Sequence, residues 1–180
     1  MSETSSSVSL RPFRVDDIGR VLAWRNQPEV ARYMYTDHRI SEAEHARWFA
    51  AAMGDESRRY WIIELDGEPV GVAGLNEISV TQRRAYCASY LALEAHRGHG
   101  LGTAAERQLM DHAFLDLGLD KLCTEVLATN SRGVKLHERC GFRIDGVLRQ
   151  HVLKGGDRID VVSMSLMRDE WTAGRRATDG

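Results

Sequence analysis

Three glycines at alternate positions mark the segment of this chain that is best suited to bind a phosphate. Gly98, Gly100 and Gly102 stand within residues 97–104, between a predicted strand and a strongly periodic predicted helix. Residues without a Cβ let the backbone approach a ligand closely, and the first amides of a helix point at it with partial positive charge. The spacing therefore predicts an anion-binding loop suited to a pyrophosphate, with a tight strand-to-helix connection as the alternative.

The spacing of these glycines excludes two common phosphate-binding loops. A Rossmann fingerprint needs a third glycine three positions after the second, and this chain has Thr103 there. A P-loop ends in Gly-Lys-Ser/Thr, a triplet that the chain lacks. The remaining pattern resembles R-G-x-G-x-G/A, the signature with which the GNAT superfamily of N-acetyltransferases binds the pyrophosphate of acetyl-CoA.

The elements around this loop follow from apolar periodicity and turn signals. Asp66-Gly67 is the strongest hairpin signal, Ser41-Glu42-Ala43-Glu44 is a capping box, and Gly118 is placed to end the most periodic helix. The order β-α-α-β-β-β-α-β-α-β-β predicts an α/β fold with a mixed, mostly antiparallel sheet. The expected strands are 9–13, 60–65, 69–75, 84–93, 121–127, 142–148 and 159–167, and the expected helices start near Asp16 or Asp17, at Pro28, after Ser41, at Leu101 and at Ser131.

Composition narrows the class of protein and of partner. The 180 residues predict one domain over 1–180, with polar ends at 1–7 and 172–180 expected to fray. A net charge of -2 without a long basic run argues against broad nucleic-acid binding and favours a small-molecule or peptide substrate.

The cysteines and the apolar stretches indicate the compartment. Cys87, Cys123 and Cys140 are odd in number and widely spaced within apolar patterns, which predicts buried free thiols in a reducing compartment. No stretch approaches the roughly 20 apolar residues of a membrane span, and no signal segment is recognisable. A cytoplasmic protein without membrane contact is expected.

Two further motifs support the same superfamily independently of the glycine loop. Residues 130–132 (NSR) with 136–142 (LHERCGF) are similar to the N-x6-L/Y-E-x-x-G-F block, although each piece alone is explained by helix capping. Tyr90-Leu91-Ala92 ends a strand five residues before Arg97. The resemblance covers nearly the whole chain and implies the GNAT fold, in which about seven strands are flanked by helices and a splayed strand pair receives CoA. It implies acetyl-CoA contacts from Leu91, Ala92, Arg97, Gly98, His99, Gly100, Leu101, Gly102, Thr103, Asn130 and Arg139.

Transfer of acetyl from a thioester to an amine needs a base, an oxyanion donor and an acid. Glu125 stands where several members of the superfamily carry a base, and alternation places it on one strand face with Cys123. An exposed strand glutamate is the alternative. His137 replaces the usual tyrosine acid, so it is predicted either to protonate the CoA thiolate or to be a surface histidine. A backbone N–H near Leu91 or Ala92 is the expected oxyanion donor.

No metal is expected, because His96 and His99 have no third ligand nearby and a loop histidine facing phosphate explains them better.

A narrower resemblance concerns the acceptor. Residues 24–26 (WRN), Met34-Tyr35 and 154–157 (KGGD), with other scattered residues, look like the sugar-nucleotide N-acetyltransferases of pseudaminic acid biosynthesis. Those enzymes acetylate the 4-amino group of a UDP-linked 4-amino-4,6-dideoxy-N-acetyl-altrosamine. Trp48 and Met34 are alternatively core residues. The resemblance implies substrate contacts from Arg25, Asn26, Met34, Tyr35, His45, Trp48 and Tyr90.

Three functions stay open on these grounds. The first is acetyl-CoA-dependent N-acetylation of a nucleotide-linked amino sugar. The second is acetylation of a protein α-amino group, as in ribosomal-protein acetyltransferases. The third, prompted by the missing tyrosine, is a non-catalytic acetyl-CoA-binding module. Because sheets in the superfamily often pair at their edges, a homodimer is one expected assembly.

Overall fold

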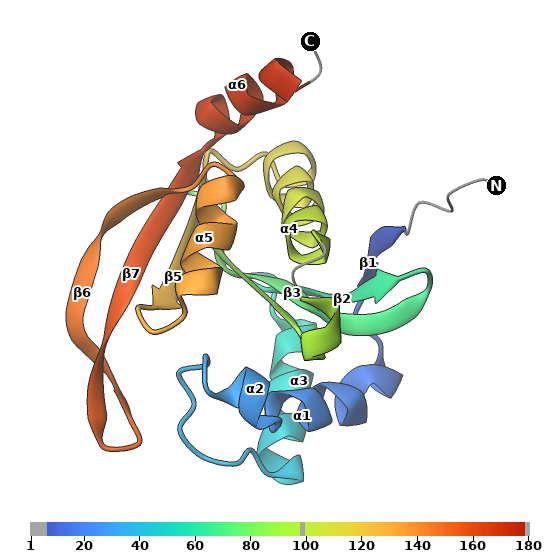
Figure 1. The fold of residues 1–180 in the computed structure, drawn as a ribbon. Helices are drawn as coiled ribbons and strands as arrows, with labels where there is room; N and C mark the ends of the chain where they lie inside the picture. The colour runs from blue at the N-terminus through green and yellow to red at the C-terminus, as the bar shows by residue number, and fades with distance from the viewer. Residues whose placement is uncertain (1–6, 98–99, 179–180) are drawn as a thin grey trace.

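The computed structural model describes residues 7–97 and 100–178, which form one seven-stranded sheet covered by helices on both faces (Figure 1). The strands are β1 (Val8–Pro12), β2 (Arg59–Leu65), β3 (Glu68–Ser79), β4 (Arg84–Leu91), β5 (Lys121–Leu127), β6 (Arg143–Lys154) and β7 (Asp157–Met167). The helices are α1 (Ile18–Arg25), α2 (Pro28–Ala31), α3 (Glu42–Gly54), α4 (Leu101–Asp111), α5 (Ser131–Arg139) and α6 (Arg168–Thr178). Short 3-10 turns lie at Val15–Asp17 and Glu94–His96, and a π-helical turn lies at His112–Asp116.

The strand order in the sheet is β1-β2-β3-β4-β5-β7-β6. Every neighbouring pair is antiparallel except β4 and β5, which are parallel. The expected mixed, mostly antiparallel sheet is therefore confirmed. The hairpin between β2 and β3 turns at Asp66 and Gly67, whose φ angles of 52° and 85° are those of the left-handed turn that this dipeptide favours.

Alternating residues of the central strands supply two separate cores. On one face, Trp61 and Ile63 of β2 pack toward Leu109 and Phe114, on α4 and the π-helical turn that follows it. On the other face, Ile62 packs with residues of α1 and α3 such as Trp24 and Phe49. The two-residue period of a strand thus places α4 and α5 over one face and α1 to α3 under the other, as Figure 1 shows.

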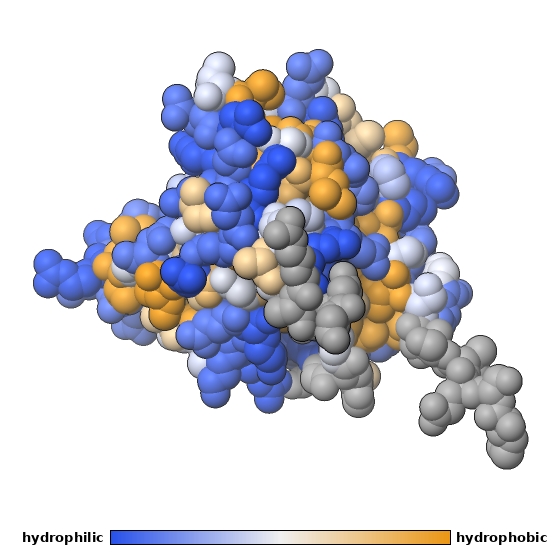
Figure 2. Space-filling view, turned by 90° about the horizontal axis from the view of Figure 1, so that it is seen from above, coloured by the Kyte–Doolittle hydropathy of each residue, from blue (hydrophilic) through white to orange (hydrophobic). Residues whose placement is uncertain are grey.

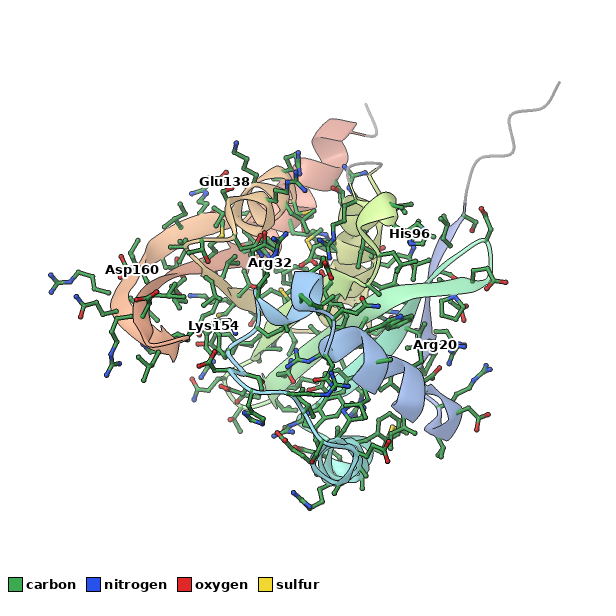
Figure 3. The ribbon with its side chains drawn as sticks, turned by 60° about the horizontal axis from the view of Figure 1, so that its bottom comes forward. Arg20, Arg32, His96, Glu138, Lys154 and Asp160 are labelled. Atoms are coloured by element: carbon green, nitrogen blue, oxygen red, sulfur yellow. The ribbon has the colours of Figure 1, made fainter. Side chains whose placement is uncertain are left out.

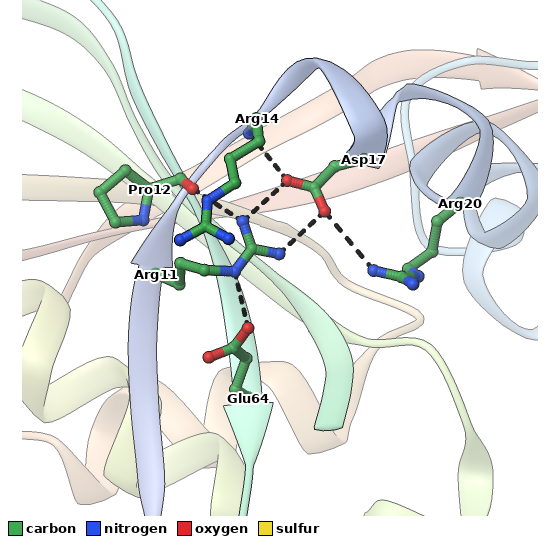
Figure 4. A network of polar contacts seen from close by, with 6 residues as sticks. All are labelled: Arg11, Pro12, Arg14, Asp17, Arg20 and Glu64. Atoms are coloured by element: carbon green, nitrogen blue, oxygen red, sulfur yellow. Dashed lines mark hydrogen bonds and ion pairs between the residues drawn. The ribbon is translucent and has the colours of Figure 1, made fainter. Parts of the chain in front are cut away.

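A polar network fixes the start of α1 against the first strands (Figure 4). Arg11 donates to both oxygens of Asp17 at 3.0 and 2.9 Å and to Glu64 of β2 at 2.7 Å. The backbone N–H of Arg14 also donates to Asp17, which is 2% exposed. Burial alone raises the pKa of Asp17, but the guanidinium and these hydrogen bonds outweigh it and leave the pKa below its usual value.

Several helix boundaries differ from those expected from sequence. The helix that begins at Pro28 ends at Ala31 and leaves Met34 in a turn, and a third helix, α3, belongs in the predicted order before β2. Ser41 accepts from the backbone N–H of Glu44, but the Glu44 side chain pairs with His38, so only half of the capping box forms. The segment expected to fray from Thr172 is helical in α6 through residue 178.

The surface agrees with the composition. In the view of Figure 2, hydrophilic residues cover most of the face and apolar residues form separate patches. No helix within the described ranges is both long and apolar enough to cross a membrane. All three cysteines are free, as expected, with Cys87 and Cys123 buried and Cys140 half-buried.

Candidate functional site

The parallel pair β4 and β5 opens into a cleft. The two strands are paired only from Arg84–Lys121 to Tyr86–Cys123, although β4 continues to Leu91 and β5 to Leu127. The remaining edge of β4 has no strand beside it, and residues 87–91 border a cleft of about 1540 Å³. Unpaired backbone groups at such an edge are free to bind an extended ligand that carries amides. This is the splayed pair that the resemblance to the GNAT superfamily implies.

The strand register along this edge shows which of the two candidate oxyanion donors, the N–H of Leu91 or that of Ala92, is free of the sheet. The N–H of Ala92 donates to the Val70 carbonyl at 2.8 Å, so it is committed to the sheet, and Ala92 does not line the cleft. Leu91 is paired with Gly71, one position before that bond, and alternation turns its N–H toward the open side. Its carbonyl accepts from Arg97 at 3.1 Å. Leu91 is thus the candidate whose amide remains available.

The end of the cleft beside α4 and α5 is built for an anion. Gly100 is the N-cap of α4 with φ 81°, a left-handed conformation that glycine tolerates, and it has no side chain to occupy the first amides of the helix. Gly100, Gly102 and Thr103 line the cleft, whereas Leu101 is buried beside it. Gly98 and His99 lie outside the described residues. The features fit a pyrophosphate at the helix N-terminus.

Basic side chains surround this end of the cleft. Four arginine and lysine side chains line it, and in the described part of the chain none of the four has a carboxylate partner. Their positive charge is therefore available to phosphates. Asn130, which also borders the cleft, uses its side-chain oxygen to cap α5 through the Gly133 N–H at 3.0 Å. The basic residues are Arg97, Arg132, Lys135 and Arg139.

His137 lies on α5 at the border of the cleft and is 5% exposed, so it is not a surface histidine. Its Nδ1 is 3.5 Å from Oε1 of Glu106 on α4, which is fully buried. Glu106 also accepts from Ser89 Oγ at 3.0 Å and from Cys87 Sγ at 3.4 Å. Burial alone raises the pKa of Glu106, but His137 and these donors lower it, and the net shift is downward.

Glu125 lies on the opposite face of the splayed pair from His137. It projects from β5 on the side of α1 to α3, where Tyr35 Oη donates to its Oε2 at 2.7 Å. Burial and this carboxylate raise the pKa of Tyr35 above its usual value. The two candidate catalytic groups therefore stand on either side of the open β4 edge, one toward each half of the cleft.

An aromatic wall forms the half of the cleft below the sheet. His45 stacks on Trp48 with ring centroids 5.2 Å apart, and Trp48 meets Tyr60 edge-on at 5.3 Å. Gly74 makes room for Tyr60, since a Cβ there would lie 2.6 Å from its ring. His45 Nε2 and Tyr90 Oη are buried without a hydrogen-bond partner, and a buried polar atom in a cleft that lacks one is suited to a ligand.

Arg25 brings a positive charge to this wall. It is half-buried at the end of α1 and donates to Thr36 Oγ1 at 3.3 Å, and no carboxylate in the described residues forms an ion pair with it. Burial and the charge of Arg25 both lower the pKa of His45, which keeps the imidazole neutral near pH 7. The acceptor half therefore combines this cation with neutral aromatic groups and with carboxylates such as Glu125.

The loop between α2 and α3 covers this half and carries Met34 and Tyr35. Asn26 does not line the cleft: its side-chain amide exchanges two 2.9 Å hydrogen bonds with the Ile40 backbone and thereby holds the loop. From the other side, Lys154 at the end of β6 donates to the Thr36 carbonyl at 2.8 Å (Figure 3). Asn26 thus has a structural place in the site.

The sequence did not reveal the role of Glu106 or the hydrogen bond from Lys154 to the Thr36 carbonyl in the loop between α2 and α3. Glu106 had a visible signal, because it interrupts the apolar stripe of α4 between Ala105 and Leu109. This hydrogen bond joins residues 118 positions apart, and no local sequence pattern indicates such a contact.

Residues 7–143 match the family model described as Acetyltransferase (GNAT) domain. The chain is 28% identical over 170 residues to spermidine N(1)-acetyltransferase of Escherichia coli K12, covering 94% of this chain and 91% of the relative. It is 25% identical over 128 residues to acetyltransferase PseH of Campylobacter jejuni, covering 71% and 78%. Spermidine N-acetyltransferase from Vibrio cholerae, solved in complex with CoA and spermine, superposes with a TM-score of 0.86 at 23% identity, covering 92% of this chain and 98% of that one.

The family model spans well over half of the chain and ends at the first residue of β6. Its match agrees with the seven-stranded sheet, the open β4 edge and the N-terminus of α4. This protein belongs to the GNAT family of acetyltransferases, and it is an N-acetyltransferase that uses acetyl-CoA as its co-substrate.

Proposed function

We propose that this enzyme acetylates the 4-amino group of a UDP-linked amino-deoxy sugar. The observation that carries the proposal is the unneutralised Arg25 in the acceptor half of the cleft. A nucleotide sugar offers a diphosphate to this cation, a flat base to the wall of His45, Trp48 and Tyr60, and hydroxyls to the orphaned Tyr90 Oη. The sequence resemblance to sugar-nucleotide acetyltransferases points the same way.

In this proposal the two proton transfers are carried out by groups on opposite sides of the cleft, Glu125 on one side and His137 on the other. Glu125, held by Tyr35, takes the proton of the attacking amine directly or through one water. The amine forms a C–N bond with the thioester carbon, and the N–H of Leu91 stabilises the oxyanion. When the C–S bond breaks, His137 gives its proton to the CoA thiolate. Glu125 ends protonated and His137 neutral, and proton exchange with solvent restores both, so that one proton is lost by the amine and one is gained by the thiolate in each turnover.

A polyamine is the second candidate acceptor, because the E. coli relative is named a spermidine N(1)-acetyltransferase and carboxylates line this cleft. Of these, Glu44 already accepts from His38 at 3.0 Å and Glu125 from Tyr35, whereas Glu29 and Glu77 have no ion-pair partner in the described residues. An unneutralised arginine repels a polycation, which ranks the polyamine second. A protein α-amino group and CoA binding without turnover remain as further outcomes of the test.

The test is a comparison of acceptors with release of the CoA thiol as the readout. A UDP-linked 4-amino sugar, spermidine and an N-terminal peptide are each varied at saturating acetyl-CoA. We expect the highest kcat/KM with the nucleotide sugar. Turnover with spermidine alone or peptide alone would transfer the function to that acceptor class, and CoA binding without turnover on any of them would indicate a binding module.

A further inference from the structure

A buried cluster around Glu106 lies next to the cleft, and Glu106 itself has no function in the proposals above. Its members come from three elements: Cys87 and Ser89 from β4, Glu106 from α4 and His137 from α5. A carboxylate that is 0% exposed costs several kcal/mol unless it is paired and hydrogen-bonded. Ser89 and Cys87 donate hydrogen bonds to it, and His137 is the one neighbour among the three that can carry a positive charge.

The positions of the two ring nitrogens of His137 indicate which one contacts Glu106 and which one faces the cleft. Nδ1 lies 3.5 Å from Glu106 and is buried without another partner. Nε2 is not buried in this way. A separation of 3.5 Å is longer than a normal hydrogen bond, and such catalytic contacts shorten when the ligands are bound. Nδ1 is therefore committed to Glu106, and Nε2 is left for the cleft.

We propose that Glu106 is a positioning residue for His137: it accepts the Nδ1–H, fixes the tautomer and ring orientation, and stabilises the imidazolium whose Nε2 proton goes to the departing CoA thiolate. This inference rests on the acid role of His137 in the proposed function. Burial disfavours a charged imidazole, so a buried histidine can serve as a general acid only with such a counter-charge.

The other ionisable groups around the pair do not compete for this proton. Burial and Glu106 raise the pKa of Cys87 well above its usual value, and burial raises the pKa of Cys140 to about 12. Both thiols therefore stay protonated near neutral pH. Glu106 also raises the pKa of Cys140, while Arg107 and Arg139, which are both exposed, lower it.

The experiment compares Glu106→Gln with Glu138→Gln, a matched control on α5 that removes the same charge from an exposed position next to His137 (Figure 3). For Glu106→Gln we expect kcat to fall roughly tenfold with unchanged acetyl-CoA binding, and the alkaline limb of the pH–rate profile to move to lower pH. Glu138→Gln should match the wild type in all three. An unmoved alkaline limb in Glu106→Gln would overturn the proposal.

A second background separates positioning from packing. In His137→Tyr, a neutral phenol serves as the acid and needs no counter-charge, so adding Glu106→Gln should cause no further loss of kcat. An equal loss in both backgrounds would show that Glu106 acts through folding alone. One zinc ion per chain surviving dialysis would also overturn the proposal, because the metal would occupy Nδ1.

One readout does not depend on the acceptor. In ¹⁵N-histidine spectra of the whole enzyme, with His137 assigned from the His137→Ala variant, the imidazolium signal should persist to higher pH in the wild type than in Glu106→Gln. Equal titration midpoints would refute the pairing even if the acceptor is a nucleotide sugar. A shifted midpoint in an enzyme that does not acetylate the sugar would refute the proposed acceptor and leave the pair standing.

Discussion

Replacement of Arg25 by glutamine separates the two leading acceptors, because the predicted changes have opposite signs. Arg25 is half-buried, makes one bond to a neutral hydroxyl, and has no carboxylate partner in the described chain. A hydrogen bond between this cation and a diphosphate contributes about 1.5 to 3 kcal/mol, roughly 10- to 150-fold in KM. For a polyamine, the same change removes a repulsion.

Steady-state kinetics at saturating acetyl-CoA provide the assay. In Arg25→Gln we expect KM for the UDP-linked amino sugar to rise by that factor while acetyl-CoA binding is unchanged. Arg32→Gln is the control, since Arg32 is exposed, stacks on Tyr33 and does not line the cleft. An unchanged KM for the sugar, or a lower KM for spermidine together with wild-type activity on it, would refute the role given to Arg25.

Three further predictions concern the acid, the sheet and the first helix. His137→Ala should lower turnover at least about tenfold with acetyl-CoA binding intact by calorimetry, because the thiolate loses its proton donor; unchanged turnover would contradict this. Gly71→Ala places a Cβ 2.2 Å from the Tyr90 carbonyl and should destabilise the fold by about 1 to 3 kcal/mol in urea unfolding, whereas Gly54→Ala, with open space around it, should not. Asp17→Asn should cost about 1.5 to 3 kcal/mol at pH 7, because it removes one of the two carboxylates that pair with Arg11 and leaves Glu64 alone. Since the pKa of Asp17 is lowered by folding, its contribution is present above the unfolded pKa of about 3.9 and is lost as the pH falls through the folded pKa. The stability difference between wild type and Asp17→Asn should therefore shrink below about pH 3.9, and a difference independent of pH would contradict it.

Local signals in the sequence were sufficient for most of the fold. The strand at Lys121–Leu127 has the predicted bounds, and the turn at Asp66-Gly67 and the helix stop at Gly118, with φ 64°, are where the residue types require them. Helix α6 (Arg168–Thr178) was missed because the polar composition of the tail suggests fraying, while Trp171 packs on Phe114 with ring centroids 5.0 Å apart and anchors the start of this helix.

The site was predictable where the chemistry lies within one motif. The loop and helix around Gly100 and the strand face of Glu125 follow from spacing and alternation. Contacts between distant segments were not predictable: the pairing of Glu106 with His137 and of Tyr35 with Glu125 depends on how the sheet opens. Asn26 shows the converse, because a residue expected at the substrate holds a loop instead.

The most direct test of the central claim is a crystal structure of the enzyme with CoA and a UDP-linked 4-amino sugar. We expect the CoA sulfur at the open edge of β4 near His137, the sugar amine on the side of Glu125 within about 3 to 3.5 Å of where the thioester carbon sits, and the diphosphate at Arg25. A sugar bound with its amine turned away from the sulfur, or a diphosphate out of reach of Arg25, would contradict the proposed acceptor.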